Sequence, residues 1–186
     1  LSPYSMYKLK IEKYLKTISS KDFKVIIFRY PNIIGSDPSG KLGENNNHIG
    51  RIVPLFYKNL IKMKKNILYY DYIKKKFPYR NYMHVEDIVN INLKVVENLE
   101  KFENKYYIYN IKNKKEYTNS EVLNSLSKIL YKKPIIEFKQ INKKESISQN
   151  VKLKDDILKI IKYKIKYQDL KKILQTNLKW FKKIYH

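Results

Sequence analysis

Tyr4 and Lys8 are the residues near the start of the chain whose types and spacing could do chemistry. Four positions apart on a helix, their side chains share one face. A tyrosine hydroxyl is a poor base at neutral pH, but a neighbouring ammonium group favours the phenolate. Such a phenolate can accept a proton from an alcohol while hydride leaves the adjacent carbon. The spacing equally fits a solvated lysine beside a packed tyrosine, and in a chain with 18 tyrosines the pair alone does not decide.

A helix and a strand must position this pair. Ser2 and Pro3 favour a helix start. Apolar residues then recur at helical spacing up to about residue 18, namely Tyr7, Ile11, Tyr14, Leu15 and Ile18. Residues 23–30 follow as an apolar run, typical of a strand buried on both faces of a parallel sheet. Residues 32–50 are predicted to form a loop that holds all four glycines, which indicates unusual dihedrals or close approach to another group.

Strand and helix signals alternate along the rest of the chain. Strands are predicted at residues 67–70, 80–84, 106–111 and 135–138, and helices at residues 54–63, 86–99, 155–161 and 169–184. Thr118 and Glu121 form a capping box, which predicts a further helix after residue 118. This alternation predicts an α/β fold, with the last βα units of a doubly wound sheet early in the chain and a smaller mixed α/β cap later.

Composition excludes several kinds of site. The 186 residues contain no cysteine, which excludes a disulfide scaffold, a thiolate metal site and a cysteine nucleophile. With only three histidines, no metal site is expected. No apolar run approaches the roughly 20 residues of a transmembrane helix, and no signal peptide is expected, so we predict a cytoplasmic protein without a membrane partner. The chain begins with Leu1, which suggests a fragment.

The net charge of +23, from 40 basic and 17 acidic residues, invites a nucleic-acid interpretation. However, the only arginines are Arg29, Arg51 and Arg80, whereas nucleic-acid readers favour arginine for bidentate base contacts. The lysines are spread along the chain, and the abundance of Lys, Ile, Asn and Tyr is typical of an AT-rich genome. We therefore expect no specific nucleic-acid partner.

Three motifs follow one another along the chain. They read SPYSMYK at residues 2–8, RYPNIIGSDPSGKLGE at residues 29–44 and RNYMHVEDIV at residues 80–89. In order and spacing they resemble the patterns SPYxxSK, RYFNxxGAxPxGxxGE and RDYIHVxDLA of the extended short-chain dehydrogenase/reductase family, and within it those of the UDP-glucose 4-epimerases. The resemblance runs from residue 1 to about residue 111 and is weaker beyond it. Tyr7, Pro31 and Asn81 depart from these patterns.

The resemblance implies an isomerase that interconverts UDP-glucose and UDP-galactose through a 4-keto sugar, with NAD as a tightly held cofactor. Tyr4 would be the general base and acid. Lys8 would bind the nicotinamide ribose and favour the Tyr4 phenolate. Tyr30 would border the nicotinamide through its backbone. These three are the residues that the resemblance places at the cofactor.

The resemblance also implies a site for a UDP-sugar substrate. Asn32 would bond near the phosphates, and Gly50 to Ile52 would reach the diphosphate or sugar through backbone groups. Tyr69 would lie against the uracil, while Arg80 and Lys144 would bind phosphate oxygens. The expected substrate-binding residues are Asn32, Arg51, Ile52, Tyr69, Arg80 and Lys144. A turn role for Asn32, a solvated Arg80 and core packing of Tyr69 remain alternatives.

Two further residues of the motifs are expected to be structural: His84 as a packed imidazole and Asp87 as a helix cap. The apolar stripe of the first helix is expected to serve a homodimer interface in the intact enzyme. Another NAD-dependent sugar-nucleotide epimerase or dehydratase, or a non-catalytic degenerate fragment, remain alternative functions.

One family feature is absent from the sequence. No glycine-rich turn of the form GxxGxxG, which binds the NAD pyrophosphate at a helix N-terminus, occurs in the 186 residues. We therefore expect the C-terminal part of a doubly wound Rossmann-type sheet plus a smaller mixed α/β substrate-binding cap. Residues 1–50 would be the last βα units of the NAD-binding domain, without its N-terminal part. Residues 51–186 would mainly form a sugar-nucleotide-binding domain, with some segments returning to the sheet.

Overall fold

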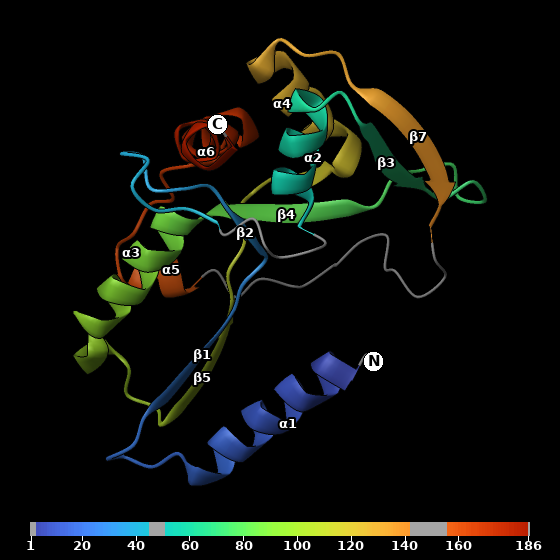
Figure 1. Ribbon diagram of the computed structural model, residues 1–186. Helices are drawn as coiled ribbons and strands as arrows, with labels where there is room; N and C mark the ends of the chain where they lie inside the picture. Colours follow the sequence, from blue (N-terminus) through green and yellow to red (C-terminus); the bar gives the residue numbers. More distant parts are fainter. Residues whose placement is uncertain (1–2, 45–50, 142–155, 186) are drawn as a thin grey trace. The chain divides into compact units, whose positions relative to one another are not determined.

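A computed structural model describes residues 3–44, 51–141 and 156–185. The expected mixed α/β fold with parallel strands is confirmed (Figure 1). The chain divides into two compact units. The first takes its described residues from 1–30, 91–111 and 151–164, and the second from 31–90, 112–150 and 165–186. Each unit is described by itself, and the expected domain boundary at residue 50 stays a prediction.

The first unit is built on a parallel pair of strands. β1 (Val25–Arg29) lies beside β5 (Tyr106–Asn110), with Val25 opposite Tyr106. The unit also holds α1 (Pro3–Ile18), a 3-10 helix (Leu99–Lys101), α5 (Asp156–Ile160) and the later part of α3 (Val85–Val96). The parallel pairing and the first helix agree with the sequence-based expectations.

Burial in the first unit is lower than the sequence predicts. The strand β1 was expected to be buried on both faces, but only Val25 is buried, and the rest is half-buried or exposed. The physical reason is that, among the described residues, β1 pairs with β5 alone. The helix α1 has no buried residue either. It is tied to the strands by an ion pair between Glu12 and Arg29 and by the Tyr106 hydroxyl, which donates to the Glu12 carbonyl at 3.2 Å.

A three-stranded sheet forms the centre of the second unit. β2 (Asn32–Ile34) runs parallel to β4 (Tyr79–His84), and β6 (Glu116–Thr118) runs antiparallel to β4. The prediction of an uninterrupted loop from residue 32 is therefore wrong over β2. These three residues form a strand because they pair with Tyr82 to His84, about fifty positions later in the sequence. Local sequence signals cannot reveal so distant a partner.

Three whole helices, the start of α3 and a second parallel pair complete the second unit. α2 (Ile52–Ile61) and α4 (Asn119–Leu130) contact β3 (Lys65–Tyr70), which pairs with β7 (Ile135–Gln140), while α6 (Leu170–Tyr185) packs against α2 and α4 (Figure 1). The expected capping box is confirmed: Thr118 Oγ1 accepts from the Glu121 amide at 3.1 Å, and the Glu121 carboxylate accepts from the Thr118 amide at 2.7 Å.

The core of the second unit holds its sheets against these helices. It joins buried residues of α2, α4 and α6 to those of β2, β3 and β4, including Phe56, Leu68, Tyr82, Leu123 and Phe181. Within the described ranges, no helix has the length and apolar character to cross a membrane. The same ranges contain no cluster of three histidine or acidic side chains able to hold a metal ion.

Candidate functional site

A cavity of about 770 Å³ in the second unit brings together most of the expected substrate residues. It is lined by β2, by Glu44 of the loop, by β4, by the end of β3 and by the beginnings of α2 and α4. Five expected residues line it, namely Asn32, Arg51, Ile52, Tyr69 and Arg80. The sixth, Lys144, lies outside the described residues, as does Gly50.

The sheet positions two of these side chains. Asn32 opens β2 opposite Tyr82 of β4, and its amide nitrogen donates to the Asn81 carbonyl at 3.3 Å. Arg80 lies two residues before Tyr82 on β4, and its Nη1 donates to the Tyr79 carbonyl at 2.9 Å. Because β2 and β4 are paired, residues about fifty positions apart in the sequence face one cavity.

The cavity has cationic side chains in its lining. Two of the three arginines of the chain, Arg51 and Arg80, line it. Arg51 is also the N-cap of α2 and makes no side-chain capping bond there, so the first turn of the helix, beginning at Ile52, faces the cavity uncapped. A helix N-terminus carries a partial positive charge and presents N–H donors. This combination suits an anionic ligand with several oxygens.

Two tyrosines give the cavity aromatic surface. Tyr69, which was expected, is 39% exposed. Tyr82 was not singled out from the sequence, although it lies in the third motif between Arg80 and His84. It is buried, and this burial raises the pKa of Tyr82 to about 12, so its hydroxyl stays protonated at neutral pH. That hydroxyl lies 3.4 Å from the side-chain oxygen of Asn119, another lining residue that the sequence did not indicate.

Close packing against the glycine-rich loop explains why this segment uses glycine. A Cβ atom on Gly35 would lie 2.2 Å from the His84 ring, and one on Gly43 would lie 2.3 Å from the Trp180 ring. Gly35 also has a positive φ of 91°, which favours glycine. The loop is therefore held between β4 and α6, as the expectation of close approach required.

Replacing Gly43 with alanine should destabilise the second unit by about 1–3 kcal/mol, because the added methyl group overlaps the Trp180 ring. Urea unfolding of the two proteins measures the difference. Lys41→Ala, an exposed change in the same loop, is the matched control and should leave the midpoint nearly unchanged. An unfolding midpoint for Gly43→Ala equal to that of the unmodified chain would disprove the close contact.

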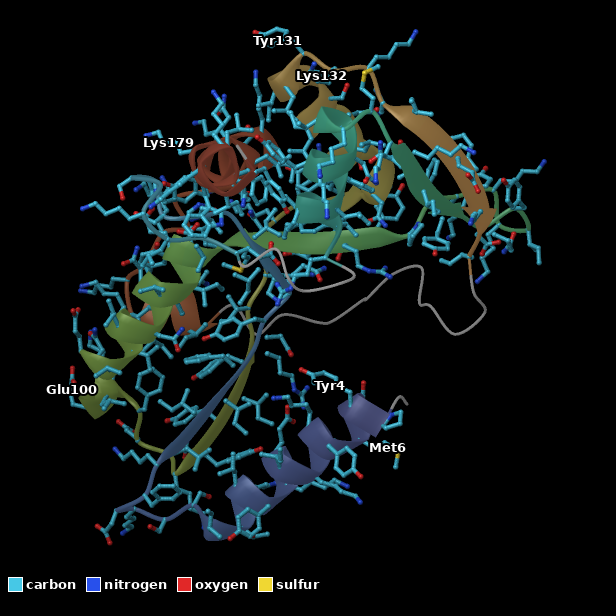
Figure 2. All side chains as sticks on the ribbon, in the orientation of Figure 1. Tyr4, Met6, Glu100, Tyr131, Lys132 and Lys179 are labelled. Carbon is cyan, nitrogen blue, oxygen red and sulfur yellow. The ribbon has the colours of Figure 1, made fainter. Side chains whose placement is uncertain are left out.

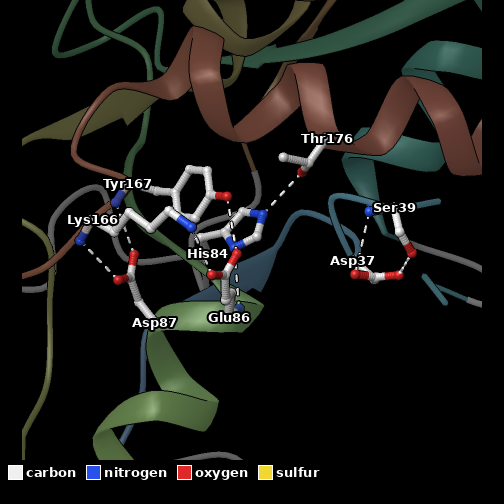
Figure 3. A network of polar contacts seen from close by, with 8 residues as sticks. All are labelled: Asp37, Ser39, His84, Glu86, Asp87, Lys166, Tyr167 and Thr176. Carbon is white, nitrogen blue, oxygen red and sulfur yellow. Dashed lines mark hydrogen bonds and ion pairs between the residues drawn. The ribbon is translucent and has the colours of Figure 1, made fainter. Parts of the chain in front are cut away.

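The His84 ring lies against Gly35 of the loop and makes polar contacts with α3 and α6, the latter two shown in Figure 3. Its Nδ1 accepts from the Glu86 amide at 3.1 Å, and its Nε2 lies 2.9 Å from the Thr176 hydroxyl. That hydroxyl donates to the Ile173 carbonyl, so Nε2 is the donor, and the ring is neutral with its proton on Nε2. The ring is fully buried and stacks on Tyr167 at 3.8 Å, in agreement with the expected packed imidazole.

Asp87 is structural in a different way from the one predicted. α3 begins at Val85, so Asp87 lies inside its first turn. Its two carboxylate oxygens accept from the backbone amides of Lys166 and Tyr167 at 2.8 and 3.0 Å (Figure 3). The neighbouring Glu86 binds the Lys166 ammonium at 2.7 Å and the Tyr167 hydroxyl at 2.9 Å. The acidic start of α3 thus anchors the segment that leads into α6.

The stability of the chain should fall as the pH drops below 6.5, the ordinary pKa of histidine. Burial lowers the pKa of His84, and this outweighs the opposing effect of Glu86 and Asp87. The unfolded chain then binds more protons than the folded one below pH 6.5. The contribution of the neutral His84 to stability is therefore fully present above pH 6.5 and is lost as the pH falls towards the lowered pKa. Thermal melting from about pH 7 to pH 5.5 measures the slope, before most carboxylates titrate. His84→Asn should flatten it, and an equal slope in the variant would contradict the assignment.

The expected catalytic pair lies in the first unit. Tyr4 and Lys8 lie on adjacent turns of α1, and the Lys8 ammonium is 5.7 Å from the centroid of the Tyr4 ring. Both side chains are exposed; Figure 2 shows Tyr4 pointing away from the helix. Tyr30 is half-buried, and its hydroxyl accepts from the Asn92 amide nitrogen at 2.7 Å. The roles expected for Tyr4, Lys8 and Tyr30 at NAD stay predictions.

Sequence comparison matches the chain to one family profile and to several curated proteins. A profile described as the NAD dependent epimerase/dehydratase family matches residues 1–111. UDP-glucose 4-epimerase of Lacticaseibacillus casei is 26% identical over 186 residues, which cover 96% of this chain and 55% of that protein. The enzyme of the same name from Erwinia amylovora is 32% identical over 133 residues, 68% of this chain and 39% of that protein. The chain thus spans about half the length of the curated relatives it matches.

Solved structures show the same fold. UDP-glucose 4-epimerase from Stenotrophomonas maltophila, solved with NAD and formylated UDP-arabinopyranose, has a TM-score of 0.85 at 17% identity and covers all of this chain. The Bifidobacterium longum enzyme, solved with NAD+ and UDP, has a TM-score of 0.84 at 21% identity and covers 97% of it. This chain spans 56% and 55% of those two proteins. The predicted fold class is confirmed by this likeness.

Proposed function

Because the chain belongs to the NAD dependent epimerase/dehydratase family, we propose that its second unit binds the UDP part of a UDP-sugar and that the protein acts as a UDP-glucose 4-epimerase. The observation that carries the proposal is the cavity in which five of the residues expected at the substrate meet, two of them arginines. The curated relatives of that name support the choice of sugar nucleotide.

The cavity suits a nucleoside diphosphate in size and charge. Its volume of about 770 Å³ lies within the range of small-molecule sites. Arg51, Arg80 and the first turn of α2 supply donors and positive charge for a diphosphate. Tyr69 supplies an aromatic face for the base, as uracil requires. The single carboxylate of the lining, Glu44, is already engaged with Arg51 in an ion pair.

The first unit would supply the acid–base chemistry. In the proposed reaction Tyr4 takes the proton from the 4-hydroxyl of the sugar and later returns it, which is general base and general acid catalysis by one group. Lys8, with its ammonium 5.7 Å from the ring centroid, stabilises negative charge on Tyr4. When bound, NAD supplies a hydride acceptor that also gives the hydride back to the sugar.

Calorimetric titration of the chain with UDP, uridine and inorganic pyrophosphate tests the binding proposal. We expect UDP to bind at least about tenfold more tightly than either part, because base and diphosphate contacts combine in one cavity. Pyrophosphate also reports how much of the binding comes from the overall charge of +23. Equal affinities for UDP and pyrophosphate would show that the lysine-rich surface, and not the cavity, is responsible.

A further inference from the structure

We propose that Glu44 is a positioning residue: its carboxylate holds the Arg51 guanidinium at the cavity for the diphosphate, and Trp180 of α6 fixes Glu44 in place. The inference rests on the proposed function and deepens it. The family resemblance implies a role for Arg51 through its backbone only, and none for Glu44 or Trp180.

The ion pair between Glu44 and Arg51 joins a largely buried carboxylate to an exposed guanidinium. The Arg51 Nε lies 3.0 Å from the Glu44 Oε1. The Glu44 side chain is 13% exposed, whereas that of Arg51 is 57% exposed. The contact is an ion pair and not a hydrogen bond, because the Glu44 Oε1 accepts no hydrogen bond from the described residues. Charge attraction therefore keeps the Nε edge of the guanidinium beside the carboxylate, while the side chain stays 57% exposed and open to an anion.

Glu44 and Arg51 lie at the boundary between two cavities. Glu44 and Arg51 line the cavity of about 770 Å³ and also a second one of about 960 Å³, which the glycine-rich loop and the start of α3 complete. A guanidinium at this junction faces a ligand in the first cavity together with Arg80. Its orientation then decides whether two arginines or one can reach the same diphosphate.

The helix α6 fixes the end of the loop that carries Glu44. The Trp180 Nε1 donates to the Glu44 carbonyl at 2.8 Å, and the absence of a side chain on Gly43 lets the indole ring approach. Directly before Trp180, the Lys179 Nζ donates to the Pro38 carbonyl at 3.0 Å, and about one turn earlier Asn177 donates to the Ser36 hydroxyl at 3.2 Å. These contacts from one helix hold the loop along its length.

Positioning and simple electrostatics predict opposite effects for one substitution. A carboxylate near a bound diphosphate repels it, so removing that charge alone should tighten binding. If Glu44 instead orients Arg51, then Glu44→Gln should weaken binding although it removes a negative charge. The amide has the same shape as the carboxylate, so folding is preserved and the sign of the change is informative.

The experiment measures UDP and uridine affinities of the chain, of four single variants and of one double variant by calorimetry. Arg51→Gln should weaken UDP binding about tenfold, since a charge-assisted hydrogen bond is lost, and leave uridine binding unchanged. Glu44→Gln should weaken UDP binding severalfold and add little to Arg51→Gln in the double variant. Trp180→Phe, which keeps a ring but loses the N–H, should weaken UDP binding in the same direction. Arg29→Gln, the control, removes the same charge from the ion pair with Glu12 in the first unit. It should leave the affinities for UDP and uridine unchanged.

Three results would contradict the positioning role of Glu44 or the proposed function. UDP binding by Glu44→Gln that equals or exceeds that of the unmodified chain overturns the positioning role. A loss of uridine binding as large as the loss of UDP binding in Arg51→Gln shows general disruption and also overturns it. No UDP binding by the unmodified chain would instead refute the proposed function, and the inference with it.

Discussion

Replacing Tyr4 with phenylalanine should lower epimerase turnover of an NAD-loaded, active form of the protein by about 100-fold to 10,000-fold, the usual contribution of a general acid–base group. The change removes one oxygen from a side chain that is 71% exposed, so little packing is lost and the fold should be unaffected. The Lys8 ammonium remains, but it has no phenolate to stabilise. Conversion of UDP-galactose to UDP-glucose, followed by a coupled assay, measures the loss.

Tyr7 provides the matched control for this experiment. It lies on the same helix, is 66% exposed and has no role in the proposed chemistry, so Tyr7→Phe should retain full turnover. UDP affinity should be unchanged in both variants, because the proposed UDP site lies in the second unit. Turnover by Tyr4→Phe comparable to that of the control would remove Tyr4 from the mechanism.

Replacing Arg80 with glutamine should weaken UDP binding by about 10- to 100-fold, which corresponds to the loss of charge-assisted hydrogen bonds to phosphate. Arg80 lines the cavity from β4, and its bond to the Tyr79 carbonyl orients the guanidinium from the strand itself. We expect a larger effect than for Arg51, whose side chain depends on an ion pair at a loop end. Calorimetry with UDP and uridine separates the phosphate contribution from that of the base.

Arg80→Lys adds a geometric test of the same residue. A lysine keeps the charge but lacks the planar fork of donors that binds two phosphate oxygens, so it should restore only part of the affinity. Affinity for UDP in Arg80→Gln equal to that of the unmodified chain would show that the ligand does not use this cavity.

Two residues expected at the substrate come together because the motifs that carry them lie on paired elements. Asn32 and Arg80 belong to separate motifs, and the pairing of β2 with β4 brings them to one cavity. The close approach inferred from the glycines is likewise present, with His84 and Trp180 as the groups that approach. Short motifs carry this information because their side chains and backbone shapes are specific.

Other features could not be predicted because they depend on distant partners. The strand β2 exists through its pairing with Tyr82 to His84, and the local sequence reads as a loop. The burial of β1 was overestimated, since an apolar run does not reveal how many strands flank it. The contacts of Asp87 with Lys166 and Tyr167 cross about eighty residues, so the sequence favoured the local role of a helix cap instead.

The location of the bound nucleotide is the most direct test of the proposed function. Two-dimensional NMR of the isotope-labelled chain, titrated with UDP, reports which backbone amides respond. We predict that the largest shifts occur at the cavity residues Asn32, Arg51, Ile52, Tyr69 and Arg80. Shifts that spare these residues and are spread instead over the exposed lysines of α6 would contradict a UDP site in this cavity.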